Sequence, residues 1–411
     1  MGAEARLSSD AVSAAAAPEE RQGPARMRVA ALVDHYLPGY MAGGALRTMA
    51  NMAQQLANDV DFRVITRDRD LRATEPYPDL VPGAWARVEG TPVRYLAPGE
   101  RTPTGVARAV REARPEVLYL NSCLSPAFTL LPLLTRGLGM VPRVPVVVAS
   151  RGELAEGALS LKRAKKVAFL RAARAVGVYR GVLWQASSEL EAAEVRRWFG
   201  AGARVMVAGD LRDLPRAPRP PAPKRPGELR AAFLSRISGN KNLAGALEML
   251  AGVRGEVRFT IYGPAEDAAY WAECQARIAK LPSNVRVEYA GPLRPEQVAD
   301  ALAAHHLLLF PTLGENFGHV ILEALGAGIP VLTSDRTPWD ALEAAGAGWT
   351  VPLEQPERFG ALLQAYADAG MDEHARRSAA ARAHGEAVAR DEAVLEANRA
   401  LFRRAAREGA R

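Results

Sequence analysis

The chain has 411 residues, of which 48% are hydrophobic and 24% charged, a composition typical of globular proteins and not of disordered or fibrous ones. At roughly 100–200 residues per domain, this length predicts two domains, with three as the alternative. No stretch approaches the roughly 20 apolar residues of a membrane-spanning helix. Only two cysteines are present, too few for a disulfide framework or a structural zinc site, so we expect a reducing, cytoplasmic setting.

The net charge of +7 is concentrated in one segment, Ala158–Arg180, which has no acidic residue. Apolar residues recur through it at roughly helical spacing, and a basic amphipathic helix can lie on an anionic membrane. The alternative is a solvated basic helix whose apolar side packs on the core. We do not expect nucleic-acid binding, because the segment has few aromatic residues and the rest of the chain is formally neutral. The residues expected to contact a membrane are Lys162, Arg163, Lys165 and Lys166.

The first half of the chain alternates short apolar strands with helices. Residues 1–26 lack a regular period and predict a flexible tail. The first helix is expected at Leu46–Ala57. Strands alternating with helices predict a doubly wound parallel sheet, here over residues 27–213. The predicted strands are Arg28–Val33, Phe62–Thr66, Val93–Leu96, Val117–Leu120, Val144–Ala149 and Val182–Gln185.

A proline-rich segment, residues 214–228, separates this domain from a second one. Proline disfavours helix and sheet, so the segment predicts an extended linker. The alternation then restarts over residues 229–375, and residues 376–411 predict a helical segment that packs back toward the first domain. Two such domains form a cleft, where α/β folds bind ligands. The strands expected after the linker are Arg230–Leu234, Val257–Tyr262, Val285–Tyr289, Leu307–Phe310 and Val331–Thr333.

The most informative motif is Pro311–Ser334, with the sequence PTLGENFGHVILEALGAGIPVLTS. It follows an apolar strand, turns through glycine, and opens a helix near Phe317–Gly318, where unpaired backbone N–H groups suit an anion. Glu315 stands at the mouth of this turn. Glu323 lies among apolar neighbours, and such a carboxylate needs hydrogen-bond partners. The alternative is a helix with one acid on its solvated face.

A second motif places two cations around a glycine turn. Arg236 and Lys241 follow the first strand of the second domain and precede a helix that begins at Leu243. Two cations beside a helix N-terminus suit a diphosphate group. The alternative is an ordinary basic loop, although lysine is scarce in this chain.

The Glu-x7-Glu arrangement within GENFGHVILEALGAGIPV resembles the signature of retaining glycosyltransferases of family 4. The resemblance extends from Met27 to the C-terminus and implies the GT-B fold, which is two Rossmann-like domains with a donor/acceptor cleft. It also implies a metal-independent hexosyltransferase without a cofactor. By position, Glu323 would bind the ribose of a nucleotide-sugar, and Arg236 and Lys241 would clamp its diphosphate. The residues implied to hold the donor sugar are Glu315, Asn316, Phe317 and Gly318.

Two loops have weaker signals of their own. Gly43 and Gly44 end a glycine loop that lacks the GxGxxG spacing, so a turn-forming role is the alternative. The resemblance implies that this pair approaches the donor phosphate. Leu293 lies in a Gly-Pro-Leu loop that matches the family's base-binding loop.

The segment Ser150–Glu153 departs from the common family pattern, because Arg151 stands where many members have a histidine. It resembles a subfamily with an RGE motif, found in enzymes that build bacterial surface polysaccharides. We expect Arg151 and Glu153 to shape the donor–acceptor site, with Arg151 among the catalytic residues. A structural Arg–Glu pair is the alternative.

These motifs predict a retaining transferase that moves a hexose from a UDP- or GDP-type sugar to a hydroxyl acceptor, with a lipid-linked acceptor as one option. The expected role is cell-surface polysaccharide or glycolipid synthesis, and the expected place is the cytoplasm or the inner face of the membrane. The six histidines have no metal-ligand spacing. The alternatives are a GT-B sugar-nucleotide epimerase and a non-catalytic nucleotide-binding partner at a membrane.

Overall fold

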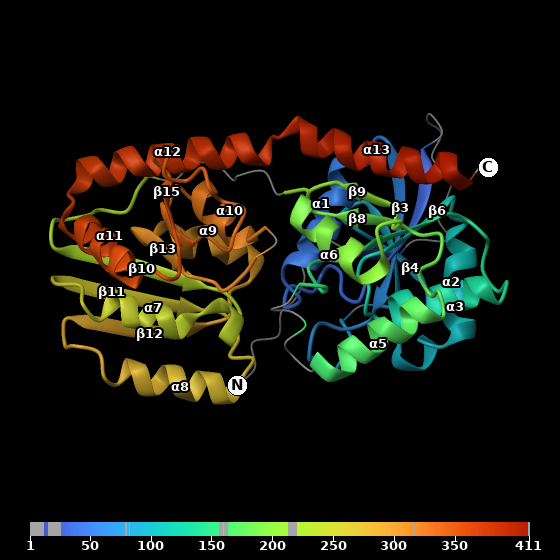
Figure 1. Ribbon diagram of the computed structural model, residues 1–411, viewed down its shortest axis with the longest axis horizontal. Coiled ribbons are helices and arrows are strands. Elements are labelled where there is room, and N and C mark those ends of the chain that lie inside the picture. Colours follow the sequence, from blue (N-terminus) through green and yellow to red (C-terminus); the bar gives the residue numbers. More distant parts are fainter. Residues whose placement is uncertain are drawn as a thin grey trace. The chain divides into compact units, whose positions relative to one another are not determined.

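The chain folds into two compact units, which a computed structural model shows in Figure 1. The structure describes residues 12–14, 26–78, 80–81, 83–155, 159, 163–212, 220–315 and 317–409. One unit comprises Met1–Arg212 and Glu392–Arg411, and the other comprises Asp213–Asp391. Each is an α/β unit built on a mainly parallel sheet, as predicted.

The first unit contains a nine-stranded sheet with the order β1-β4-β5-β3-β2-β6-β7-β8-β9. All pairs are parallel except β1–β4 and β4–β5. The central strands are apolar along their length because helices cover both faces. The strands are β1 Val12–Ala14, β2 Met27–Leu32, β3 Val60–Arg67, β4 Trp85–Val88, β5 Thr91–Leu96, β6 Val117–Leu120, β7 Val146–Ala149, β8 Leu183–Ala186 and β9 Val205–Val207. The helices are α1 Gly44–Gln55, α2 Pro103–Ala113, α3 Leu131–Gly137, α5 Arg163–Ala175, α6 Glu189–Phe199 and α13 Glu392–Gly409.

The second unit contains a six-stranded sheet with the order β12-β11-β10-β13-β14-β15, and every pair in it is parallel. The strand order reverses between β10 and β13, and between β2 and β6 in the first unit. Open α/β sheets bind ligands at such reversals, beyond the carboxyl ends of the strands. The strands are β10 Glu228–Leu234, β11 Glu256–Tyr262, β12 Val285–Gly291, β13 Leu307–Phe310, β14 Val331–Ser334 and β15 Gly348–Val351. The helices are α7 Leu243–Leu250, α8 Ala268–Ile278, α9 Pro295–Ala303, α10 His319–Gly326, α11 Pro356–Asp368 and α12 Met371–Ala389.

The C-terminal helical segment is divided between the units. Helix α12 ends at Ala389, and α13 begins three residues later and belongs to the first unit. There the Phe402 ring packs against Phe62, at 5.4 Å between centroids, and against Tyr119, at 5.7 Å. In the second unit α12 crosses α10 closely, since a Cβ at Gly385 would come within 3.0 Å of the Leu325 side chain.

A buried lysine fixes the end of the proline-rich segment to the second unit. The Lys224 Nζ donates hydrogen bonds to the carbonyl oxygens of Glu228, at 2.7 Å, and Ala367, at 3.2 Å. It also lies 5.5 Å from the centroid of the Tyr366 ring. Burial lowers the pKa of Lys224 to about 8. Backbone carbonyls therefore replace much of the hydration of this cation, and the linker enters the sheet at a fixed point.

Two buried histidines beside this lysine predict acid sensitivity of the second unit. The rings of His306 and His374 lie 5.1 Å apart, and burial lowers their pKa values to about 3 and about 4. Below pH 6.5, the ordinary histidine pKa, the unfolded chain therefore binds more protons than the folded one. The stabilisation from the neutral rings is complete above pH 6.5 and is lost as the pH falls toward 4.

We expect the thermal midpoint of the second unit to fall between pH 7 and pH 5, and His374→Phe to reduce this fall. Tyr366, which shares a 2.7 Å hydrogen bond with His374 Nδ1, also donates to the His306 carbonyl at 3.2 Å, so it keeps one partner in the variant. Circular dichroism melts at both pH values measure the difference. An equal fall in the variant and the unchanged protein would contradict the prediction.

Candidate functional site

Two loops meet at the strand-order reversal of the second unit. The first follows β10 and the second follows β13. The Leu313 N–H donates to the Asn240 carbonyl at 2.8 Å, and the Asn242 amide donates to the Pro311 carbonyl at 2.8 Å. Asn242 has φ 56 and caps helix α7 through the Gly245 N–H. The loops that carry the two predicted motifs are thus joined into one surface.

The structure brings Lys241 and Glu315 into an ion pair on this surface. Their side chains are 13% and 17% exposed, so both are largely shielded but reachable from solvent. The ammonium of Lys241 lies 6.0 Å from the centroid of the Phe310 ring at the end of β13. The residue predicted to bind phosphate therefore lies against the residue predicted to hold the donor sugar.

Arg236 lies on the same loop as Lys241 and is more exposed. Its side chain is 47% exposed and pairs with Glu266 at 3.1 Å. The loop is tightly packed below, because a Cβ at Gly263 (φ 123) would lie only 1.9 Å from the Ser235 carbonyl oxygen. Glycine at 263 therefore allows the chain ends of β10 and β11 to approach closely.

The turn into helix α10 is held by aromatic packing. Gly318 is its N-cap with φ 80, and the carbonyl of the buried Phe317 accepts a hydrogen bond from the Trp339 indole. The Phe317 ring packs edge-on against His319, at 5.0 Å. Glu323 is partly buried one turn further along α10. Asn316 lies outside the described residues.

The remaining predicted donor residues lie in two other loops. Leu293, in the loop after β12, packs against the core of the second unit. In the first unit Gly43 is the N-cap of α1 with φ 72, and Gly44 is the first residue of that helix. The preceding backbone is held by Asp70, whose carboxylate accepts from the N–H groups of Tyr40, at 2.9 Å, and Met41, at 3.2 Å.

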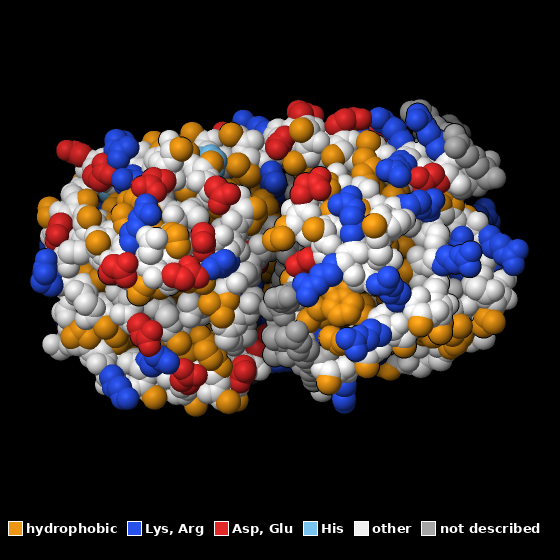
Figure 2. Space-filling view, in the orientation of Figure 1, with side chains coloured by type: hydrophobic (Ala, Val, Ile, Leu, Met, Phe, Trp, Pro, Cys, Tyr) orange, Lys and Arg blue, Asp and Glu red, His pale blue; other side chains and the backbone are white. Residues whose placement is uncertain are grey.

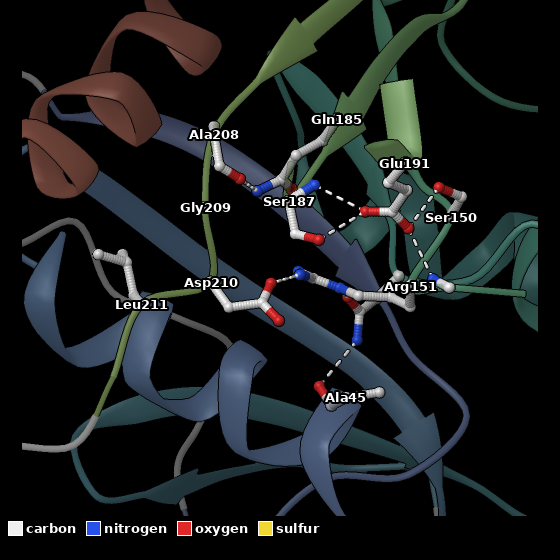
Figure 3. Close-up of polar contacts among 12 residues, drawn as sticks. Ala45, Ser150, Arg151, Gln185, Ser187, Glu191, Ala208, Gly209, Asp210 and Leu211 are labelled. Carbon is white, nitrogen blue, oxygen red and sulfur yellow. Dashed lines mark hydrogen bonds and ion pairs between the residues drawn. The ribbon is translucent and has the colours of Figure 1, made fainter. Parts of the chain in front are cut away.

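Arg151 is the centre of a buried polar network in the first unit, shown in Figure 3. Its Nε donates to the Asn121 side-chain oxygen at 2.7 Å, and its guanidinium contacts the Asp210 carboxylate and the Tyr119 hydroxyl. The side chains of Arg151 and Asp210 are 8% and 10% exposed. Burial alone would lower the pKa of Arg151, but Tyr119 and Asp210 raise it above its ordinary value. These contacts hold the Arg151 guanidinium in a fixed place, which suits a residue that positions other groups.

Glu153 has partners different from those of Arg151. Its carboxylate accepts from the Ser122 hydroxyl at 2.8 Å, the Cys123 N–H at 2.7 Å and the Leu124 N–H at 3.0 Å. Burial raises the pKa of Glu153, and these hydrogen bonds oppose that rise. The carboxylate thus fixes the loop after β6. The described contacts of the two residues do not include the Arg–Glu pair that was the structural alternative.

Sequence reasoning missed the partners in this network: Tyr119, Asn121, Glu191 and Asp210. Glu191 accepts from the Ser150 hydroxyl at 2.7 Å and from the Gly152 N–H at 2.6 Å. Asp210 and Asn121 lie 59 and 30 residues from Arg151 in the chain, so no local spacing links them. Asn121 could have been found from the sequence, because it comes directly after the apolar strand β6. Residues at the carboxyl ends of strands line the ligand-binding edge of a parallel sheet.

The basic segment includes helix α5, which buries Leu170 and Ala173. Lys165 is exposed, Lys166 is partly buried, and Val176 just beyond the helix is 77% exposed. Lys162 and the side chain of Arg163 lie outside the described residues. Figure 2 shows that Lys and Arg side chains predominate over acidic ones on the visible face of the first unit. The apolar side of α5 therefore packs on the core, while basic groups remain accessible.

The residues that the structure describes contain no group of three or more His, Cys, Asp or Glu side chains that could hold a metal ion. Among the helices of the described segments, none is both long and apolar enough to cross a membrane.

Residues 228–368, which form most of the second unit, match the protein family described as "Glycosyl transferases group 1". A stretch of 106 residues is 35% identical to D-inositol 3-phosphate glycosyltransferase of Streptomyces scabiei, covering 26% of this chain and 24% of that protein. A stretch of 109 residues is 30% identical to the phosphatidylinositol N-acetylglucosaminyltransferase gpi3 subunit of Schizosaccharomyces pombe, covering 26% and 23%. These matches thus span only about a quarter of the curated relatives.

Solved structures resemble almost the whole chain. Anabaena HepE (Alr3699), in complex with UDP and glucose, has a TM-score of 0.68 at 18% identity, covering 92% of this chain and 99% of that one. Sucrose-phosphate synthase of Thermosynechococcus elongatus has a TM-score of 0.67 at 16% identity, with the same coverage. With the two parallel-sheet units, these neighbours confirm the predicted GT-B fold class.

Proposed function

We propose that this protein is a retaining, metal-independent glycosyltransferase that uses a nucleotide diphosphate sugar. The observation that carries the proposal is the Lys241–Glu315 pair beside Arg236, at the strand-order reversal of a unit that matches group 1 glycosyl transferases. Anabaena HepE was solved with UDP and glucose and, in a second structure, with UDP-glucose. This supports a UDP-hexose donor, with a GDP-hexose as the alternative.

In the proposed complex, Arg236 and Lys241 neutralise the donor diphosphate, and Glu323 accepts hydrogen bonds from the ribose. Glu315 and the backbone of residues 316–318 hold the sugar. Because Lys241 pairs with Glu315, the arriving diphosphate competes for the same ammonium. The released carboxylate of Glu315 is then free to accept hydrogen bonds from sugar hydroxyls.

The proposed reaction forms a bond from the acceptor oxygen to the anomeric carbon and breaks the bond from that carbon to the diphosphate oxygen. The acceptor attacks on the face from which the diphosphate leaves, and the diphosphate takes the acceptor proton. The protein then supplies mainly positioning and electrostatic stabilisation. Such a site needs the cations at the departing diphosphate more than it needs a general base.

The decisive experiment incubates the full chain with UDP- and GDP-hexoses, with and without candidate hydroxyl acceptors, and follows the anomeric carbon by NMR. The proposal expects acceptor-dependent transfer with retained configuration. Conversion of the donor to another sugar without acceptor would instead support the epimerase. Nucleotide binding without any turnover would support the non-catalytic partner.

The proposed acceptor is a hydroxyl compound of cell-surface polysaccharide or glycolipid synthesis, and a lipid-linked acceptor would bring the basic segment to an anionic membrane. We expect charge reversal at Lys165 and Lys166 to weaken binding to anionic vesicles by at least about 30-fold, since each of the two surface cations contributes about 1 kcal/mol. UDP affinity should remain unchanged. Vesicle sedimentation measures the binding to anionic vesicles, and calorimetry measures the UDP affinity. Equal sedimentation of both proteins would contradict the membrane proposal.

A further inference from the structure

The loop after β14, residues 335–339, contacts the donor turn, by which we mean residues 315–318. Strand β14 pairs in parallel with β13, so both loops leave the sheet at the same edge. The donor turn is the segment proposed to hold the donor sugar, and no predicted site residue comes from the loop after β14. That loop is therefore a third element of the site, beside the loops after β10 and β13.

Two hydrogen bonds from the loop after β14 fix the backbone of the donor turn. The Arg336 carbonyl accepts from the Glu315 N–H at 3.0 Å, and the Trp339 indole N–H donates to the Phe317 carbonyl. The two contacts lie on either side of position 316 in the chain. The Glu315 side chain is held separately, by its ion pair with Lys241. Because the protein itself uses the Glu315 N–H, backbone contacts to a sugar must come from residues 316–318.

Trp339 is itself held by contacts outside the donor turn. It is only 3% exposed, and its ring lies 6.1 Å from the ring of His384 in α12. The hydroxyl of Thr350, on β15, donates to the Trp339 carbonyl at 2.6 Å. The Trp339 ring also packs against Phe317, at 5.2 Å between centroids. A fixed, buried donor holds its acceptor in place, because a carbonyl that moves away from it is left unsatisfied in the interior.

We propose that Trp339 is a positioning residue for the hexose of the donor. It acts through the Phe317 carbonyl, which sets the course of the donor turn, and the donor turn sets where the hexose lies. This inference rests on the proposed function. There the diphosphate and the ribose bind Arg236, Lys241 and Glu323, so a nucleotide without a sugar depends much less on the donor turn. Trp339 therefore contributes to the binding of the sugar and not to that of the nucleotide.

The test compares UDP-glucose with UDP by calorimetry in the full chain carrying Trp339→Phe, which keeps an aromatic ring and removes the indole N–H. We expect the affinity for UDP-glucose to fall at least about fivefold and that for UDP to change less than about twofold, because the Phe317 carbonyl loses its donor. At saturating donor, kcat should also fall at least about fivefold, since a misplaced anomeric carbon reacts more slowly. GDP-glucose and GDP replace the UDP pair if the unchanged chain binds GDP more tightly.

The matched control is Trp349→Phe, the same change at a tryptophan of the same unit. Trp349 is 7% exposed and packs against Tyr366 of α11, at 5.5 Å between centroids. Both variants should have a lower melting temperature than the unchanged chain, but only Trp339→Phe should change the ratio of the UDP-glucose and UDP affinities. Equal ratios in the two variants would overturn the inference.

Thr350 provides a milder test if Trp339→Phe does not fold. Thr350→Val removes the hydroxyl that holds the Trp339 carbonyl and should lower the same ratio about two- to threefold. Thr350→Ser keeps a hydroxyl and should preserve the ratio. In that case, an unchanged ratio in the Thr350→Val protein shows that the inference is wrong. Failure of the unchanged chain to bind either nucleotide would instead refute the proposed function, and with it this role of Trp339.

Discussion

Lys241→Ala is expected to lower kcat for sugar transfer by about 10- to 100-fold, which is about 1.4–2.7 kcal/mol of transition-state stabilisation. The physical reason is that negative charge grows on the departing diphosphate, and Lys241 is the more shielded of the two cations proposed to meet it. A cation in a partly desolvated site stabilises such charge more than one in water. Donor hydrolysis gives an acceptor-independent measure of the same step.

The matched control for this variant is Lys280→Ala, an exposed lysine just after α8 in the same unit. It removes the same charge without touching the loops after β10 and β13. Because Lys241 also pairs with Glu315, circular dichroism melts and UDP affinity must be measured beside kcat. A folded Lys241→Ala protein whose kcat stays within twofold of the Lys280→Ala protein would refute the proposed role.

The predicted strands agree with the structure wherever apolar residues form a continuous run. Val117–Leu120 and Leu307–Phe310 coincide with β6 and β13, because central parallel strands are buried on both faces. Four strands were missed, and β4 and β9 show why. They have four and three residues, too few for a period to appear. Their formation depends on pairing: β4 forms a tight antiparallel hairpin with the next strand, β5, and β9 pairs with β8, which ends 19 residues earlier in the chain.

The two site loops of the second unit were predictable because their motifs are short and local. In each motif the end of a strand, a glycine turn and a charged residue lie within a few positions of one another. The strand order then brings Lys241 and Glu315 into contact. The network around Arg151 was not predictable in the same way. Its partner Asp210 is remote in the chain, and only the fold of the first unit brings the two charges together.

The buried Arg151–Asp210 pair gives the largest stability effect that we expect. Asp210→Ala should destabilise the first unit by about 3–5 kcal/mol, because it leaves the buried guanidinium of Arg151 without its carboxylate. The loss should extend to the chain segment around Asp210. There the Asn398 amide donates to the Gly209 carbonyl at 2.8 Å and the Asn51 amide donates to the Leu211 carbonyl at 3.1 Å. Urea unfolding followed by tryptophan fluorescence measures the change.

The matched control is Asp59→Ala, which breaks the 2.9 Å ion pair between Asp59 and Arg399. The side chains of Asp59 and Arg399 are 35% and 28% exposed. Solvent can replace that partner, so we expect a loss of no more than about 1 kcal/mol. The double variant Arg151→Met with Asp210→Leu should recover most of the stability lost in Asp210→Ala, because it removes both buried charges together. If Asp210→Ala costs no more than Asp59→Ala, Arg151 is not held as a buried cation. Recovery in the double variant without recovery of transfer would instead show that Arg151 also positions the reacting groups.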